Sequence, residues 1–350
     1  MERIKFCACE IEGDTIKKPV AAIDNLIEMT KTHKPLWMPM SNEYGFFAPR
    51  IDPDNIARAF VIDVAEPKLT KEEQGGKDMF GIDWEYVPVA GGSMVRPGQP
   101  LMEDVNDWKE FIKFPNVAEW DWEGAAKANE ALVNGERIMA WTMLNGFMFE
   151  RLISFMEFEG AAMAIIDEDQ VDAVKELLDK ITTEVYIPYL ECIAKYFPTV
   201  KMLWVHDDWG TQRSPFFSLN ACMDVLVPNM QKFVAKAHEL GFFVQFHSCG
   251  ANEMLIDAYK ATGVDMWQGM ANINDFNKLY KDHGFCVTLQ LPEAANNPDL
   301  TEEEAEAIAK AFCEEFIVNG EINAVASIGF TTNPKVPKYI YKISREMLNA

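Results

Sequence analysis

The chain has 350 residues, of which 32 are basic and 55 acidic, so its formal net charge is −23. Nucleic-acid backbones and anionic membrane surfaces bind through basic residues, and this balance argues against both as partners. No apolar run approaches the roughly 20 residues that cross a bilayer, and the first residues lack the apolar stretch of a signal peptide. The seven cysteines are an odd number scattered along the chain, which is typical of reduced thiols in a cytoplasmic protein.

Short β-like runs alternate with helical patterns along most of the chain. This alternation predicts a parallel sheet covered by helices. Strands are expected at residues 35–40, 137–142, 200–206, 242–247, 264–268, 286–291 and 322–328. Helices are expected where apolar residues recur at intervals of three and four, at residues 168–196, 222–240, 251–261 and 302–318. Thr301 and Glu304 have the spacing of a capping box at the start of the last helix.

The remaining segments fit one large α/β domain. Residues 1–34 are interpreted as an N-terminal extension and helix, and residues 43–134 as one barrel strand with long loops. The chain has no Gly-x-Gly-x-x-Gly motif and no phosphate-binding loop, which argues against a dinucleotide fold. The economical interpretation is a single (β/α)8 TIM barrel over residues 1–350, with its active site at the carboxyl ends of the strands.

Two of the expected strands end abruptly in titratable side chains. The strand at residues 242–247 ends in His247, and Cys249 follows two residues later. Side chains two apart on a strand point to the same side, so this imidazole and thiol can meet at one metal ion or one substrate atom. As zinc ligands they need a third protein ligand. The alternative is a buried histidine beside a structural cysteine.

The strand at residues 200–206 leads into the second cluster, which contains His206, Asp207, Asp208 and Gln212. Adjacent carboxylates repel each other unless a cation, a proton or a charged neighbour uses them. We therefore interpret His206, Asp207, Asp208 and His247 as candidate catalytic residues. The alternative is an ordinary helix N-cap region, where aspartate is common. Spacing alone does not decide which aspartate faces the site.

Polar and aromatic side chains near other strand ends are candidates for substrate binding. They follow the expected strands at 35–40, 264–268 and 286–291, or flank the two clusters. Aromatic residues such as Trp204 and Trp267 suit an apolar pocket that accepts an aromatic molecule, although in a barrel most such residues belong to the core. Glu43 and Glu293 are equally well interpreted as solvated loop acids. The candidate substrate-binding residues are Asn42, Glu43, Tyr44, Trp204, Gln212, Trp267, Gln268 and Glu293.

These motifs together resemble the uroporphyrinogen-decarboxylase superfamily, and in particular its corrinoid-dependent methyltransferase branch. The resemblance spans most of the chain. Residues 34–39 resemble the family's first strand, and residues 146–150 with 158–160 resemble its central helix. His206-Asp-Asp-Trp-Gly-Thr-Gln212 and His247-Ser-Cys-Gly250 resemble its two site strands. The order and spacing of the pieces are more specific than any one piece. The resemblance implies a (β/α)8 barrel, in agreement with the strand and helix pattern.

Two departures from the family pattern bear on the chemistry. The decarboxylase has an arginine-rich segment after its first strand, whereas residues 40–50 hold Arg50 as their only basic residue, which suits a neutral or aromatic substrate better than a polycarboxylate. Zinc-dependent methyltransferases of the family use a His-x-Cys pair and a cysteine near the last strand, but residues 326–334 contain no cysteine. Zinc would then need Asp208, Glu43 or Glu293 as its third ligand, or the site has no zinc.

The resemblance implies a methyltransferase that moves a methyl group from a small methylated donor to the cobalt of a cobalamin on a separate corrinoid protein. The missing cysteine favours O-demethylation of an aryl methyl ether, or demethylation of a methylamine, over thiol activation. The chain has no Asp-x-His-x-x-Gly stretch resembling a corrinoid-binding module. The corrinoid protein is therefore an expected partner, docking on the loops after Asn42, Asn145, Trp209 and Gly269. A decarboxylase and a non-catalytic barrel subunit are the rival interpretations, and a homo-oligomer is compatible with each.

Overall fold

The computed structural model describes residues 18–58, 75–88, 92–133, 138–143 and 146–349. The chain forms two compact units. The larger unit contains residues 46–134 and 139–274, and the smaller one contains residues 1–45, 135–138 and 275–350. Both polar clusters that the sequence places at strand ends, around His206 and His247, belong to the larger unit. Cys7, Cys9 and Asn145 lie outside the described residues.

A five-stranded sheet has the order β1-β5-β6-β7-β8. Its strands from β5 onward are parallel neighbours, and their register sets His206 beside His247, and His247 beside Gln268. The strands expected at 137–142, 200–206, 242–247 and 264–268 are confirmed with slightly shifted ends, and one further strand of this sheet lies within residues 43–134. The five strands are β1 (Tyr44–Phe47), β5 (Ile138–Met143), β6 (Met202–His206), β7 (Phe243–His247) and β8 (Met266–Gln268).

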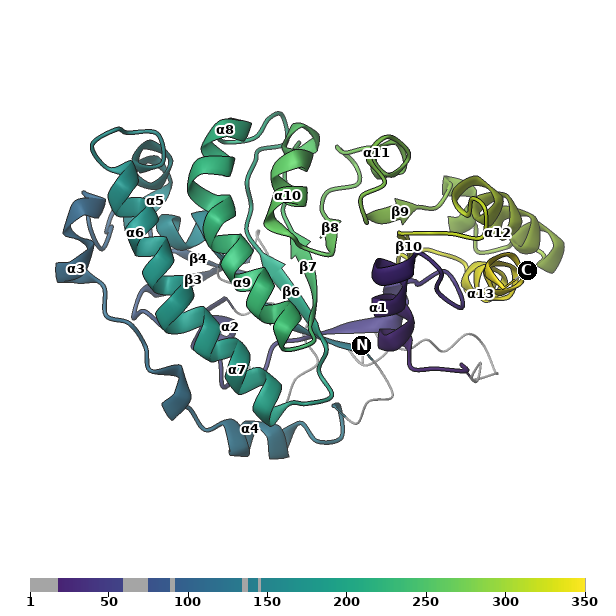
Figure 1. Ribbon diagram of the computed structural model, residues 1–350, viewed down its shortest axis with the longest axis horizontal. Coiled ribbons are helices and arrows are strands. Elements are labelled where there is room, and N and C mark those ends of the chain that lie inside the picture. The colour runs from purple at the N-terminus through teal and green to yellow at the C-terminus, as the bar shows by residue number, and fades with distance from the viewer. Residues whose placement is uncertain (1–17, 59–74, 89–91, 134–137, 144–145, 350) are drawn as a thin grey trace. The chain divides into compact units, whose positions relative to one another are not determined.

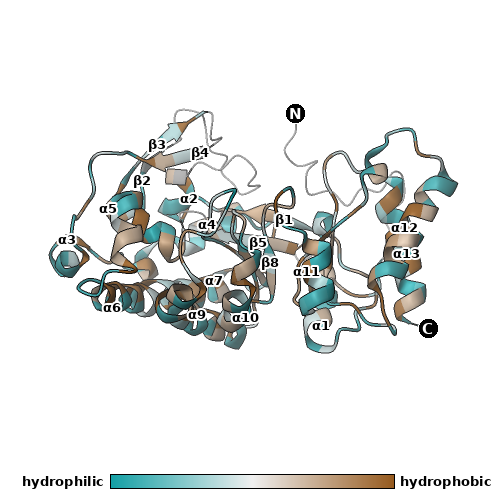
Figure 2. Ribbon diagram, turned by 90° about the horizontal axis from the view of Figure 1, so that it is seen from above, coloured by the Kyte–Doolittle hydropathy of each residue, from teal (hydrophilic) through white to brown (hydrophobic). Residues whose placement is uncertain are grey.

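Helices that follow the strands along the chain cover one face of this sheet (Figure 1). They are amphipathic, with apolar residues buried and polar residues outside (Figure 2). The helices expected at 168–196, 222–240 and 251–261 are confirmed, although the first two contain π-helical turns, at Thr182–Tyr186 and Cys222–Leu226. The helices are α6 (Val171–Ile181), α7 (Ile187–Tyr196), α8 (Leu219–Ala221), α9 (Val227–Glu239) and α10 (Ile256–Thr262).

The two faces of the parallel sheet differ, because successive residues of a strand point to opposite sides. On the helix-covered face, Trp141 Nε1 donates to Tyr189 Oη of α7 at 2.7 Å. Trp267 packs on Tyr259 of α10, with ring centroids 4.7 Å apart. The opposite face carries the alternate residues Trp204, His206, Gln245, His247 and Gln268.

A separate antiparallel sheet, which the sequence pattern did not predict, consists of β2 (Gly76–Lys77), β3 (Asp83–Val87) and β4 (Gly92–Val95). The sequence pattern predicts long loops in this segment. Strands of two to five residues are too short to show a recognisable alternation of apolar and polar side chains. The chain then forms short helices at Val105–Asp107 (η4), Trp108–Phe111 (α3), Val117–Glu119 (η5) and Trp122–Ala128 (α4).

Arg151 attaches the antiparallel sheet to helix α5 (Phe149–Ala164). Its guanidinium is fully buried and binds Asp78, next to β2, at 2.8 Å. It also pairs with Asp54 of α2 (Pro53–Arg58). A buried arginine is costly unless it is paired, and here it is bonded to two carboxylates. The start of α5 is therefore held rigidly from this side.

The smaller unit contains two parallel strands, β9 (Thr288–Gln290) and β10 (Val325–Ser327), which confirms those expected at 286–291 and 322–328. The capping box is also confirmed, because Glu304 N donates to Thr301 Oγ1 at 3.2 Å and Thr301 N donates to Glu304 Oε2 at 2.8 Å. The helices of this unit are α1 (Ala22–Thr32), η2 (Ser41–Glu43), α11 (Phe276–His283), η9 (Glu293–Asn296), α12 (Glu302–Phe316) and α13 (Lys335–Leu348).

The strand expected at residues 35–40 is wrong. This described segment is irregular apart from Met40, which forms an isolated parallel bridge with Ala326. Pro35 and Pro39 have no backbone N–H to donate to a strand ladder, which explains why an apolar run here does not become a strand. A side chain takes over part of the pairing: Met38 N donates to Ser344 Oγ at 3.0 Å.

The described cysteines, 192, 222, 249, 286 and 313, form no disulfide bond. This agrees with the expectation of reduced cysteines for the part of the chain that the structure describes. Within those same residues, no helix combines the length and the apolar character that crossing a membrane requires. The sheets and helices together form a mixed α/β architecture with a parallel sheet.

Candidate functional site

His206 and His247 form the centre of the candidate site, at the carboxyl ends of β6 and β7. The two imidazoles are stacked, with ring centroids 4.9 Å apart and planes inclined by 13°. Trp204, two residues before His206, lies against the stack with its ring centroid 5.0 Å from that of His247. The parallel register forces this proximity, because the two histidines are direct partners across neighbouring strands.

The partners of the two Nδ1 atoms decide what each imidazole presents to the site. His206 Nδ1 lies 2.7 Å from Glu150 Oε2, and an ionised carboxylate only accepts hydrogen bonds, so this Nδ1 carries the hydrogen. His247 Nδ1 faces Gln268 Oε1, whose orientation is set because Gln268 Nε2 donates to the Gly269 carbonyl at 3.2 Å. In the neutral form of each ring, the Nε2 atom therefore presents a lone pair.

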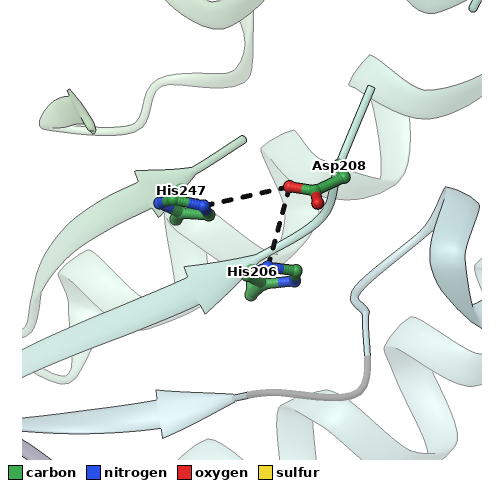
Figure 3. Close-up of side chains that lie close together, drawn as sticks. All are labelled: His206, Asp208 and His247. Atoms are coloured by element: carbon green, nitrogen blue, oxygen red, sulfur yellow. Dashed lines mark ion pairs between the residues drawn. The ribbon is translucent and has the colours of Figure 1, made fainter. Parts of the chain in front are cut away.

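Asp208 brings a carboxylate to these two nitrogens (Figure 3). Its Oδ1 atom lies 3.6 Å from His206 Nε2 and 3.9 Å from His247 Nε2. The backbone N–H of Cys249 donates to the same oxygen at 2.6 Å. One ligand atom from each of the three side chains lies within 4.8 Å of the others. Three electron-pair donors that face one another are stabilised by a cation or a proton between them.

The donor set fits a zinc ion. Two neutral imidazoles and one carboxylate are a common set of three protein ligands for catalytic zinc, with the fourth position open. Ligand atoms on a tetrahedral zinc at about 2.1 Å stand about 3.4 Å apart, and the distances of 3.6 and 3.9 Å are close to that value. Burial and the neighbouring His206 lower the pKa of His247 to about 4, so its imidazole is neutral at neutral pH.

Cys249 lies next to this group rather than at its centre. Its Sγ atom is 3.2 Å from His247 Nε2. The three side chains that converge are His206, Asp208 and His247. The expected pairing of His247 with Cys249 is therefore observed as a contact, and Asp208, one of the three acids considered as a further zinc ligand, joins the two histidines.

Asp207 points away from the histidines and caps helix α5. Its carboxylate accepts from the backbone N–H groups of Phe149 at 2.9 Å and Glu150 at 2.8 Å, and from Trp209 Nε1 at 2.7 Å. Burial and the neighbouring Glu150 carboxylate raise the pKa of Asp207 to about 6. The structure thus corrects its assignment as a catalytic residue, because both oxygens are used to hold the start of α5.

Glu150 is the site residue that the sequence analysis missed. It lies in the first turn of α5, and the cap by Asp207 presents its carboxylate to His206. One signal was available in the sequence. Glu150 lies shortly after the expected strand at residues 137–142, and residues that follow the carboxyl end of a strand are candidates for an active site. The contact joins residues 56 positions apart, so sequence spacing alone does not reveal it.

A glycine allows the loops after β6 and β7 to touch. Gly250 has a φ of +110°, and a Cβ atom there would lie 2.5 Å from the backbone carbon of Gly210. No larger residue fits this position without moving the backbone. Because Asp208 and Cys249 lie on these two loops, the close approach contributes to the hydrogen bond between them.

Two of the proposed substrate-binding residues are placed elsewhere. Trp267 is on the helix-covered face of the sheet, packed on Tyr259, because it is one residue out of phase with Gln268. The structure therefore places Trp267 on the face away from the two histidines. Gln212 is exposed in the loop after β6. Trp204 and Gln268 lie beside the histidines as expected.

The other four proposed substrate-binding residues belong to the smaller unit. Glu43 is buried and binds Lys18, Trp37 Nε1 at 2.9 Å and Met40 N at 3.0 Å, so it organises its own segment. Asn42 is half-buried beside it, and burial raises the pKa of Tyr44. Glu293 is exposed at the start of η9. Their role in binding a substrate stays a prediction.

Comparison with known proteins reveals likeness at the level of the fold. No family model matches the chain, and a search of curated proteins found no match. Among solved structures, a methyltransferase from Methanosarcina mazei is similar, with a TM-score of 0.55 and 16% sequence identity. The alignment covers 94% of this chain and 99% of the other. The fold and the strand-end cluster together define an α/β protein with a candidate cation-binding site.

Proposed function

We propose that the protein is a corrinoid-dependent methyltransferase of the uroporphyrinogen-decarboxylase type, built on a (β/α)8 barrel. The observation that carries the proposal is the convergence of His206, Asp208 and His247 at the carboxyl ends of β6 and β7. The likeness in fold to a methyltransferase over 94% of the chain supports it, as does the order of the motifs around the two histidines. In the proposed reaction, a small donor loses its methyl group to the cobalt of a cobalamin on a separate corrinoid protein.

An aryl methyl ether is the donor that suits this site best. Loss of the methyl group leaves a phenoxide, whose negative oxygen needs a cation or a hydrogen-bond donor close by. His206 Nε2, His247 Nε2 and Asp208 Oδ1 would hold that cation or proton. Trp204 and Phe46 provide an aromatic surface beside them, with ring centroids 4.9 Å apart, which suits a flat apolar donor.

Zinc is the proposed metal for this site. His206, His247 and Asp208 would hold it, and Cys249 is the neighbouring candidate for a further ligand. When bound, zinc would supply a Lewis acid for the ether oxygen. Glu150 and Gln268 would orient the two imidazoles through their Nδ1 atoms, as outer-shell partners of metal ligands do.

Methyl transfer to a reduced corrinoid protein tests the function. The protein is mixed with a panel of methoxyaromatics and methylamines, and the cobalt spectrum is followed. Methylation of cobalt that requires this chain and is lost in His247→Ala supports the proposal. Trp267→Phe, on the opposite face of the sheet, is the matched control and should retain activity.

Three other results would contradict the proposed function. Demethylation at full rate without a corrinoid protein excludes the partner, and decarboxylation of a porphyrin carboxylate identifies a decarboxylase instead. Absence of any turnover across the panel favours the non-catalytic subunit.

Zinc analysis of the wild type, Asp208→Asn and Cys249→Ala shows independently which side chains hold metal. Full activity in a zinc-free wild type would leave proton donation as the role of the cluster.

A further inference from the structure

Two buried polar atoms on the site face of the sheet lack hydrogen-bond partners among the described residues. They are Trp204 Nε1 and Gln245 Oε1, in side chains that are 3% and 1% exposed. Trp204 and Gln245 are register partners on β6 and β7. Each precedes its strand's histidine by two residues, so all four side chains point to the same face of the sheet. The two side chains therefore start one layer below the histidines, and the indole reaches up to them, with its ring centroid 5.0 Å from that of His247.

Unpaired buried polar atoms are unusual in native proteins, and here the two atoms are chemically complementary. An indole N–H can only donate a hydrogen bond, and the oxygen of an amide can only accept one. The indole of Trp141, on the helix-covered face, shows the ordinary arrangement, in which Nε1 donates to Tyr189 Oη at 2.7 Å. One group that accepts from Trp204 and donates to Gln245 would satisfy both unpaired atoms.

We propose that Trp204 and Gln245 bind a free hydroxyl group of the methyl donor. A neutral hydroxyl accepts and donates through one oxygen, whereas a carboxylate has no hydrogen for Gln245 and is costly to bury beside neutral groups. The preferred donor is then a methoxyphenol. This inference rests on the proposed function for its methoxy group, but the recognition of the hydroxyl can be tested by binding alone.

Phe46 marks the position that the donor ring takes. It is half-buried on β1 and contacts the indole of Trp204 at an interplanar angle of 79°. Both unpaired atoms are closed to solvent without a ligand. The hydroxyl therefore reaches them when the donor ring replaces Phe46 against Trp204, which exchanges one aromatic contact for another.

Isothermal titration calorimetry without any corrinoid protein tests the inference. The ligands are 4-methoxyphenol, 2-methoxyphenol, anisole and 1,4-dimethoxybenzene. The wild type should bind 4-methoxyphenol about tenfold or more tighter than anisole, because anisole leaves both buried atoms unpaired. The dimethyl ether, which cannot donate to Gln245, should be weak as well, whereas 2-methoxyphenol carries a free hydroxyl and should also bind more tightly than anisole.

Two variants remove the two hydrogen bonds separately. Trp204→Phe removes the donor and Gln245→Leu removes the acceptor, and each should bring the affinity ratio of 4-methoxyphenol to anisole close to one. Gln245→Leu decides the matter if Trp204→Phe does not fold. Trp267→Phe makes the same substitution on the opposite face of the sheet, and it should leave the ratio unchanged.

Equal binding of 4-methoxyphenol and anisole by the wild type would overturn the inference and identify a buried water as the partner of the two atoms. Failure of all four ligands to bind at millimolar concentration would overturn it too. The proposed function fails separately. Hydroxyl-dependent binding without methyl transfer refutes only the proposed function, and methyl transfer from anisole and 4-methoxyphenol with equal kcat/KM refutes only the inference.

Discussion

The two faces of the parallel sheet use similar side chains for opposite purposes. On the helix-covered face, Trp141 donates to Tyr189, whose hydroxyl in turn donates to Asp52 Oδ2 at 2.5 Å, so a buried indole, phenol and carboxyl are bonded in a chain. On the other face, the indole N–H of Trp204 has no partner among the described residues. There, two imidazoles and a carboxylate converge instead.

This difference separates what stabilises the fold from what performs chemistry. A fully bonded buried network contributes to stability and specifies one arrangement of the helices on the sheet. The open face keeps lone pairs and a donor unsatisfied, and this costs stability until a ligand binds. Substitutions on the two faces should therefore change different measured quantities, and four predictions test that division.

The largest effect is expected on activity, from His247→Ala. Loss of this imidazole removes one of the three converging donors, and methyl transfer should fall by about 10²- to 10⁴-fold. The free energy of unfolding should change far less, because the ring lies at the end of its strand. Initial rates with a reduced corrinoid protein and urea unfolding measure the two quantities. A large loss of stability with normal activity would show that this face stabilises the fold and does not perform the chemistry.

Trp141→Ala should have the opposite signature. This side chain is fully buried on the helix-covered face, and truncation of a buried tryptophan costs about 3–5 kcal/mol of stability. Urea unfolding monitored by circular dichroism gives the loss. Activity per folded molecule should remain within a small factor of the wild type. A loss below about 1 kcal/mol would show that this face is not the stabilising one.

Glu150→Gln should weaken the site while leaving the fold intact. The substitution removes the carboxylate that orients His206 through Nδ1. Loss of an outer-shell partner typically lowers metal affinity or activity by about ten- to one-hundredfold. Competition with a zinc chelator and initial rates measure both. Glu159→Gln, an exposed position on the same helix, is the control and should change neither.

Asp52 should give the protein a pH dependence of stability. Burial, with Asp54 nearby, raises the pKa of Asp52 to about 8 from its ordinary value of 3.8. Between these values the folded protein holds a proton that the unfolded chain has released, so stability falls as pH rises through this range. The contribution is fully present below the unfolded pKa and lost as pH rises through the folded pKa.

Asp52→Asn should remove this part of the pH dependence. One proton corresponds to a slope of at most about 1.4 kcal/mol per pH unit. Unfolding free energies of the wild type and the variant, measured from pH 5 to about pH 9, give the difference. Parallel curves for the two proteins would mean that Asp52 is ionised in the folded state.

Several features of the molecule could be predicted from the sequence because they depend on local pattern. The alternation of strands and helices, the capping box at Thr301 and the placement of His206 and His247 at strand ends all follow from periodicity and residue type. The strand predicted at residues 35–40 does not form, and the reason is also local. Its two prolines have no backbone N–H to donate to a neighbouring strand. The antiparallel sheet at residues 76–95 gave too short a pattern to detect.

By itself the sequence determined that two polar clusters end two parallel strands, because each cluster lies within a few residues of the strand that carries it. Only the tertiary structure decided which members face each other. Asp208 meets the histidines whereas Asp207 caps α5, and Gln268 meets His247 whereas Trp267 turns to the helices. The physical reason is that side-chain direction depends on strand register and on long-range partners such as Glu150, which is 56 residues from His206.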